Sequence, residues 1–155
     1  MGYDHTQRGV LHRWFTVLSG ALVIGGAVAG STLKSDDGRA IALILVAVGL
    51  FLGLLGAAIA WLRVHDDGDA LRIAFGPLAL FRRRVPYAAM RGAKAIALGW
   101  SHGIGIHLAP GGGWTWNVRG GAAVEITLER GRLLVSSDDP NGLVAFLRQR
   151  AKLAG

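Results

Sequence analysis

The sequence predicts a membrane α-helical hairpin followed by one small β domain. Two uncharged apolar runs lie close together near the N-terminus, at Trp14–Leu33 and Ala40–Leu62, and the polar segment Lys34–Arg39 joins them. After Arg63 the hydrophobic period changes to short apolar segments separated by turn residues, which is typical of antiparallel strands. Near the C-terminus the spacing becomes helical again, which predicts one closing helix.

These changes divide the chain into three parts. We expect a cytoplasmic N-terminal segment at 1–13, a transmembrane hairpin at 14–62 (helices 14–33 and 40–62), and a cytoplasmic domain at 63–155. A helix needs about 20 apolar residues to cross a hydrocarbon core of about 30 Å, and both runs are long enough. The second run ends in Trp61 and Arg63, residue types that are common at membrane interfaces.

Glycines spaced four apart occur on both apolar runs. They are Gly26 with Gly30 on the first run, and Gly49 with Gly53 on the second. Small residues at this spacing let two helix backbones approach closely. We therefore expect these glycines at the contact between the two helices, although glycine is common throughout the chain.

A secretory signal peptide is the alternative interpretation of the first run. Arg8 and Arg13 precede it as a basic region, and Ala27–Ala29 has the small-x-small form of a cleavage site. The run continues beyond Ala29 and a second spanning segment follows closely, which favours retention and leaves cleavage open. Under either interpretation the basic residues place 63–155 in the cytoplasm.

Composition narrows the chemistry that this chain can perform. It has no cysteine, which excludes disulfides, thiolate metal sites and a cysteine nucleophile. The net charge is +7 at pH 7, and most of the excess lies in residues 63–155. A basic domain tethered close to a bilayer meets anionic lipid before nucleic acid, so we expect no nucleic-acid partner.

The region after the hairpin alternates strands with turns and then ends in a helix. Asp138 or Asp139 is suited to cap that helix, and Pro140 fits its first turn. Apolar residues then recur at helical spacing toward a basic C-terminal end. The expected strands are Ala70–Phe75, Leu78–Val85, Lys94–Leu98, Gly103–Leu108, Trp114–Val118, Val124–Leu128 and Arg132–Ser136.

The order of seven strands and one helix is that of a pleckstrin-homology-like (PH-like) barrel. With the segments LRIAFGPLALFRRRVPYAAM and GIGIHLAPGGGWTWNVRGGAAVEITLERGRLLVSSDDPNGLVAFL, the chain resembles a family of small bacterial membrane proteins. Members of this family carry two transmembrane helices followed by a PH-like domain. The resemblance implies an antiparallel PH-like barrel closed by one C-terminal helix, in a protein of the bacterial plasma (inner) membrane. The hairpin and its flanking basic residues predict that both chain termini are cytoplasmic. The resemblance implies no particular biochemical activity.

Arg82, Arg83 and Arg84 form the densest charge in the chain. On a strand, Arg82 and Arg84 face one way and Arg83 the other. They are candidates to contact anionic lipid headgroups, at about 1 kcal/mol per basic residue near an acidic leaflet. A simpler explanation is an edge strand protected by charge, or positive-inside topology alone.

Trp100, Trp114 and Trp116 are the other candidates for lipid or partner contact. Trp114 and Trp116 share one face of an expected strand. Tryptophan suits the headgroup level of a membrane or a peptide groove, and it is equally common in a protein core. We expect a core role for one tryptophan and partner contact for another.

Catalytic, cofactor and metal signals are poor. Ser101 and His102 lack an acid nearby in sequence to orient them, and His102 and His107 would face opposite sides of one strand. The acids at Asp66–Asp69 lack the register of a calcium loop. We therefore expect no catalytic residue, no cofactor and no metal site.

These observations favour a non-enzymatic membrane protein whose cytoplasmic domain binds a protein or peptide partner, or anionic lipid headgroups. A PH-like barrel offers a groove beside its C-terminal helix that can take an added strand, so a protein is slightly preferred. The alternative is an accessory subunit of a membrane transport or envelope-maintenance complex that uses the hairpin as its interface.

Overall fold

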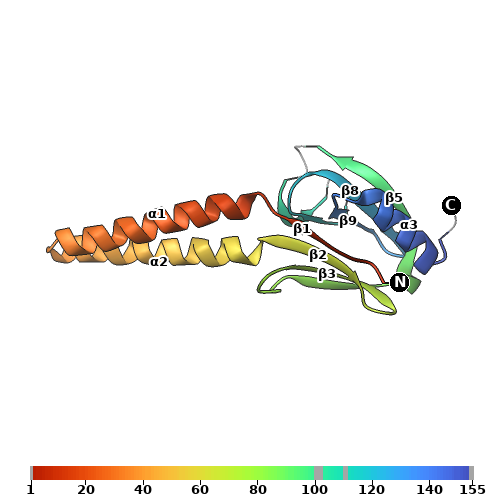
Figure 1. The fold of residues 1–155 in the computed structure, drawn as a ribbon, viewed down its shortest axis with the longest axis horizontal. Helices are drawn as coiled ribbons and strands as arrows, with labels where there is room; N and C mark the ends of the chain where they lie inside the picture. The colour runs from red at the N-terminus through yellow and green to blue at the C-terminus, as the bar shows by residue number, and fades with distance from the viewer. Residues whose placement is uncertain (1, 100–102, 110–111, 154–155) are drawn as a thin grey trace.

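The computed structural model describes residues 2–99, 103–109 and 112–153. A long pair of antiparallel helices projects from one end of a β-rich domain (Figure 1). The domain holds two sheets and one C-terminal helix, and the N-terminal segment is part of it. We call the two helices the hairpin and the rest of the described chain the β domain.

The hairpin consists of α1 (Leu11–Thr32) and α2 (Asp36–Ala58), and both helices are long and apolar enough to cross a membrane. Ser35 caps α2, because its side chain accepts a hydrogen bond from the Gly38 amide at 3.1 Å. Asp36 and Asp37 occupy the first turn, where negative charge complements the helix dipole. This cap starts α2 earlier than the expected Ala40.

The second helix also ends earlier than expected, at Ala58 instead of Leu62. The amides of Ile59 and Ala60 close a tight turn on the carbonyls of Gly56 and Ala57, both at 3.3 Å. Trp61 then begins strand β2 (Trp61–Asp66). The prediction that Trp61 ends a transmembrane helix is therefore wrong.

The first sheet contains a strand that the sequence did not predict. Strand β1 (Asp4–Arg8) lies in the expected N-terminal segment and pairs with β2, with Arg8 opposite Trp61. Strand β3 (Ala70–Gly76) and strand β4 (Arg82–Pro86) complete the order β1-β2-β3-β4. The expected strand Leu78–Val85 thus begins only at Arg82, and residues 77–81 form a loop.

The second sheet has the order β5-β8-β9-β7-β6. All neighbours in it are antiparallel except β7 and β9, which run parallel. A short 3-10 helix, η1 (Tyr87–Ala89), leads from the first sheet into the second. Its strands are β5 (Met90–Leu98), β6 (Gly105–Leu108), β7 (Trp114–Asn117), β8 (Gly121–Leu128) and β9 (Arg132–Ser136).

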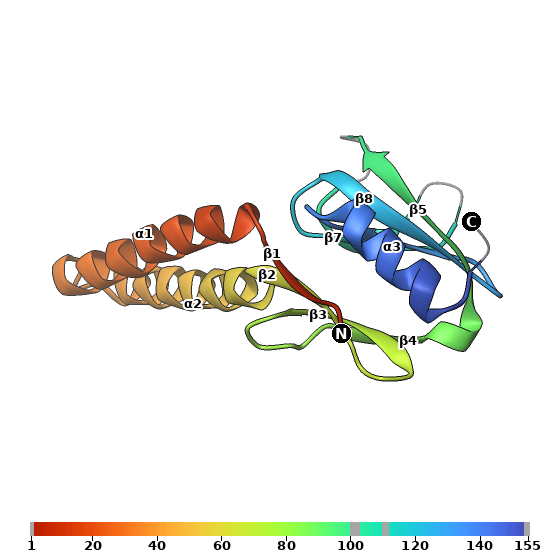
Figure 2. The same cartoon turned by 45° about the vertical axis from the view of Figure 1, so that its right-hand side comes forward.

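The expected closed barrel of about seven strands is wrong. The described residues form nine strands in two sheets, and the sheets are not closed into a barrel. Helix α3 (Pro140–Arg150) packs against β5 and β8 (Figure 2). The expected cap of this helix is confirmed, since Asp139 accepts a hydrogen bond from the Gly142 amide at 3.0 Å.

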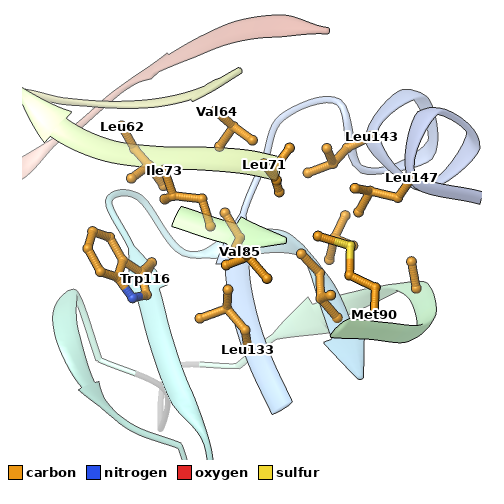
Figure 3. Close-up of a cluster of buried hydrophobic side chains, with 14 of the residues drawn as sticks. Leu62, Val64, Leu71, Ile73, Val85, Met90, Trp116, Leu133, Leu143 and Leu147 are labelled. Atoms are coloured by element: carbon orange, nitrogen blue, oxygen red, sulfur yellow. The ribbon is translucent and has the colours of Figure 1, made fainter. Parts of the chain in front are cut away.

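One main core lies between the two sheets and α3 (Figure 3). Its largest side chains are almost fully buried, which accounts for most of the apolar surface removed from water. The first sheet contributes Leu62, Val64, Leu71, Ile73, Phe75 and Val85, the second Trp116, Val124, Ile126, Leu133 and Val135, and α3 Leu143 and Leu147.

Candidate membrane-facing site

One end of the β domain adjoins the hairpin directly. Gly9 and Ala60 bracket the two helices, and the Gly9 amide donates to the Ala60 carbonyl at 2.8 Å. Ala60 in turn donates to the Gly76 carbonyl at 3.1 Å, which brings the end of β3 to this level. We call this region the hairpin end of the domain; it comprises residues 9–10, 59–61, 76–81 and 118–120.

The loop between β3 and β4 exposes large apolar side chains at the hairpin end. Leu78 and Phe81 are each 45% exposed, and Leu80 is 63% exposed. The loop turns back toward α2 (Figure 2). Among the described residues outside 11–58, the other exposed large apolar side chains are Val10, directly before α1, and Ile104, Leu108 and Trp114, on or beside β6 and β7. Apolar exposure is therefore concentrated on one side of the domain.

A groove runs between this loop and the second sheet. Its main part has a volume of about 310 Å³ and a neighbouring part about 170 Å³, and both parts are lined by Phe81 and Ile106. The smaller part reaches Ile59, the residue that follows α2. The groove therefore extends from the end of α2 into the space between the sheets. The larger part is lined by Leu80, Phe81, Arg82, Arg83, Ile106, Trp114 and Trp116.

The three consecutive arginines have different surroundings. Arg84 is paired with Asp67 and Asp69, and hydrogen bonding to its guanidinium lowers the pKa of Asp69. Arg82 lies opposite Ala74 and is exposed, whereas Arg83 lies opposite the core residue Ile73. Arg83 thus faces the second sheet and lines the groove. Of these three arginines, Arg82 and Arg83 have no carboxylate partner among the described residues and are available to bind an anion.

Cations elsewhere in the domain are mostly neutralised by acids. Arg63 pairs with Asp4 through a 2.8 Å hydrogen bond, which lowers the pKa of that carboxyl. In the described chain, no ion pair is found for five arginines at and near the hairpin end, Arg8, Arg13, Arg82, Arg83 and Arg119, nor for Arg130, Arg148 and Lys152 farther from it. The hairpin end as defined contains no carboxylate; those of the domain are Asp4, Asp66, Asp67, Asp69, Glu125, Glu129, Asp138 and Asp139.

The two described tryptophans of β7 have different exposures. Trp116 is 5% exposed and stacks on Phe75 with ring centroids 5.6 Å apart. Its Nε1 atom is buried without a hydrogen-bond partner. Trp114 is 45% exposed at the rim of the groove. Trp100, Ser101 and His102 lie outside the described residues.

The glycines singled out in the hairpin lie between its helices. A Cβ atom on Gly26 would approach the Val46 Cγ2 atom to 2.7 Å, and one on Gly49 would approach the Val23 Cγ2 atom to 2.8 Å. Gly53 faces the Ser19 Oγ atom in the same way, at 2.7 Å. Gly30 is looser, at 3.4 Å from the Ala42 Cβ atom. These glycines therefore contact the partner helix of the same chain.

Several site residues were missed from the sequence. Leu78, Leu80 and Phe81 were assigned to a strand, and Ile106 and Arg119 were not singled out. A signal was present: the apolar residues follow Gly76 and Pro77, a turn-forming pair, and immediately precede a basic cluster.

The described side chains show no group of three or more His, Asp or Glu residues that could hold a metal ion. The site therefore consists of an apolar loop, a groove and unpaired arginines, an arrangement suited to binding an amphipathic anion.

No family model, curated protein or solved structure matches the chain.

Proposed function

We propose that the chain is a non-enzymatic integral membrane protein whose β domain binds anionic lipid headgroups through its hairpin end. The observation that carries this proposal is the separation of charge along the domain. Five arginines without a carboxylate partner among the described residues lie at or near the end next to the hairpin, and that end itself contains no carboxylate. Each such arginine contributes about 1 kcal/mol near an acidic leaflet.

The dimensions of α2 support this placement. From Ala40 to Ala58 the helix is uncharged, and at 1.5 Å per residue it is about 28 Å long. That length matches a hydrocarbon core of about 30 Å. Arg82 lies two strand positions beyond Gly76, or about 7 Å at the rise of a β-strand. The arginine is therefore within reach of the phosphate layer.

The antiparallel helices leave both ends of the hairpin on one side of the bilayer. Basic residues gather there, so the positive-inside rule places the β domain in the cytoplasm. We propose the plasma (inner) membrane of a bacterium as its location on the strength of the family resemblance described above, while the charge pattern supports only the cytoplasmic side. The cytoplasmic leaflet of such a membrane supplies the anionic headgroups.

Hydrogen exchange on the full chain in lipid nanodiscs tests this function. We expect segments 77–83 and 118–120 to exchange more slowly when phosphatidylglycerol is added to phosphatidylcholine, and the protection to fade in high salt. Substituting Arg82→Gln with Arg83→Gln should reduce the effect, whereas Arg130→Gln, in the β8–β9 turn, should leave it intact. Equal exchange in both lipid compositions would contradict the proposal.

A protein partner is the second candidate, and the edge of the second sheet favours it. Strand β5 is nine residues long and lies at one end of the strand order. An edge strand presents unpaired backbone groups that can take an added strand. Cross-linkers placed on β5 and on the outer faces of α1 and α2 would distinguish two modes of partner binding. Capture of a protein from β5 supports strand addition, and capture from the helices supports the hairpin as an interface in a larger complex.

A further inference from the structure

We propose that the groove between the β3–β4 loop and strands β6 and β7 holds one anionic phospholipid from the adjoining leaflet. This inference rests on the proposed function and adds a defined site to it. The lipid's acyl chain lies along Phe81 and Ile106, and its phosphate lies at Arg82 and Arg83. A bound lipid of this kind would couple the β domain to the composition of the membrane.

The groove adjoins the end of α2, which is the level at which a lipid chain would enter it. Its smaller part begins at Ile59, which directly follows the membrane helix α2. Phe81 and Ile106 line both parts, so the apolar walls continue into the larger space. Leu80, on the wall of the larger part, is 63% exposed. An acyl chain can therefore move from the bilayer into the groove along an apolar surface.

The polarity of the groove changes in the same order as that of a phospholipid. Its walls are apolar next to the hairpin and become cationic about 7 to 10 Å farther on, at Arg82 and Arg83. Neither guanidinium has a carboxylate partner among the described residues. Arg83 is partly buried against the second sheet, where the lower dielectric strengthens its attraction for a phosphate.

A third observation concerns Trp116, which lines the groove and is 5% exposed. Its Nε1 donor is buried and has no hydrogen-bond partner. Buried donors without a partner are rare because each one loses its hydrogen bond to water. A lipid ester or phosphate oxygen in the groove would supply the missing acceptor once the side chains that cover Nε1 move aside.

Native mass spectrometry of the full chain tests the site. The protein is equilibrated in nanodiscs of equal phosphatidylcholine and phosphatidylglycerol, released into a mild detergent, and examined for retained lipid. We expect one phosphatidylglycerol per chain. Arg82→Gln with Arg83→Gln should lower its retention roughly 25-fold, at about five-fold per arginine.

Leu80→Asp provides a second variant that keeps the fold, since Leu80 is largely exposed and an aspartate there would repel the phosphate. It should also lose the retained lipid, and Arg130→Gln should keep it. The proposed lipid site would be overturned if the wild type retained no lipid, or if all variants retained it equally. If hydrogen exchange still slows when phosphatidylglycerol is added in that case, the lipid site in the groove is rejected and headgroup binding by the hairpin end is retained.

Discussion

The amide of Gly9 donates a hydrogen bond of 2.8 Å to the carbonyl of Ala60. This bond joins the second residue before α1 to the second residue after α2, so the β1–β2 ladder continues to the base of the hairpin. Gly9 is buried there, and a Cβ atom on it would lie 2.7 Å from Val118 Cγ2 and 2.9 Å from the Ile59 carbonyl oxygen. The hairpin and the β domain are therefore joined without a flexible linker.

Replacing Gly9 with alanine should loosen this junction. The added methyl group must displace Val118 or the backbone, and overpacking of this kind costs about 1–3 kcal/mol. The melting temperature of the full chain in detergent should fall. Gly20→Ala is the control, because a Cβ atom at Gly20 meets nothing within 4 Å. Equal melting of both variants and the wild type would show that the junction is not tightly packed.

Two adjacent glycines in α1 test the helix contact. A Cβ atom on Gly26 would approach the Ala42 carbonyl oxygen to 2.8 Å, whereas one on Gly25 meets nothing within 4 Å. Gly26→Ala should therefore separate the helices and lower the thermal stability, and Gly25→Ala should not. A spin-label distance between the ends of α1 and α2, measured in both variants, checks this difference. A longer distance in Gly25→Ala alone would contradict the packing.

The ion pair between Asp4 and Arg63 predicts acid sensitivity of strand β1. Hydrogen bonding to Arg63 lowers the pKa of Asp4 below its ordinary value of 3.8 in the folded chain. The pair therefore stabilises the fold above that value, and the contribution is lost as the pH falls through the lowered pKa. Melting temperatures measured from pH 6 to pH 2 should fall less in Asp4→Asn than in the wild type. Parallel curves would contradict the prediction.

The raised pKa of Tyr3 leads us to expect a loss of stability at alkaline pH. Burial raises the pKa of its phenol from 10.0 to about 12, so the unfolded chain ionises first. The stability that the neutral phenol provides is complete below pH 10 and is lost as the pH rises toward 12. Tyr3→Phe should keep the stability at pH 7 and show a shallower decline between pH 10 and pH 12. An unchanged slope would show that Tyr3 is not the group responsible.

The helices could be predicted from the sequence because membrane length and uncharged composition are local properties. Strand β1 could not, since its residues are polar and show no hydrophobic alternation. It becomes a strand by pairing with β2, whose residues lie more than fifty positions later in the chain. Trp61 was assigned to the wrong element because an apolar run has no visible boundary where a helix ends and a strand begins.

The candidate site could be predicted in part for a similar reason. The three arginines are visible in the sequence as a cluster. The acids that form ion pairs with Arg84 lie in the β2–β3 turn, and the pairing of β3 with β4 brings them close to it. The groove depends on two sheets that fail to close, which no local pattern encodes. Its residues on β6 and β7 therefore could not be linked with Phe81 from the sequence.

The most direct measurement of the central claim is the depth of the β3–β4 loop in a bilayer. The chain has no cysteine, so a single spin label can be placed at Leu80→Cys, with Arg130→Cys as the control. In nanodiscs containing phosphatidylglycerol, the label at position 80 should be accessible to oxygen and shielded from a water-soluble nickel chelate, and the label at position 130 should show the reverse. Equal access of the nickel chelate to both labels would contradict a membrane-facing hairpin end.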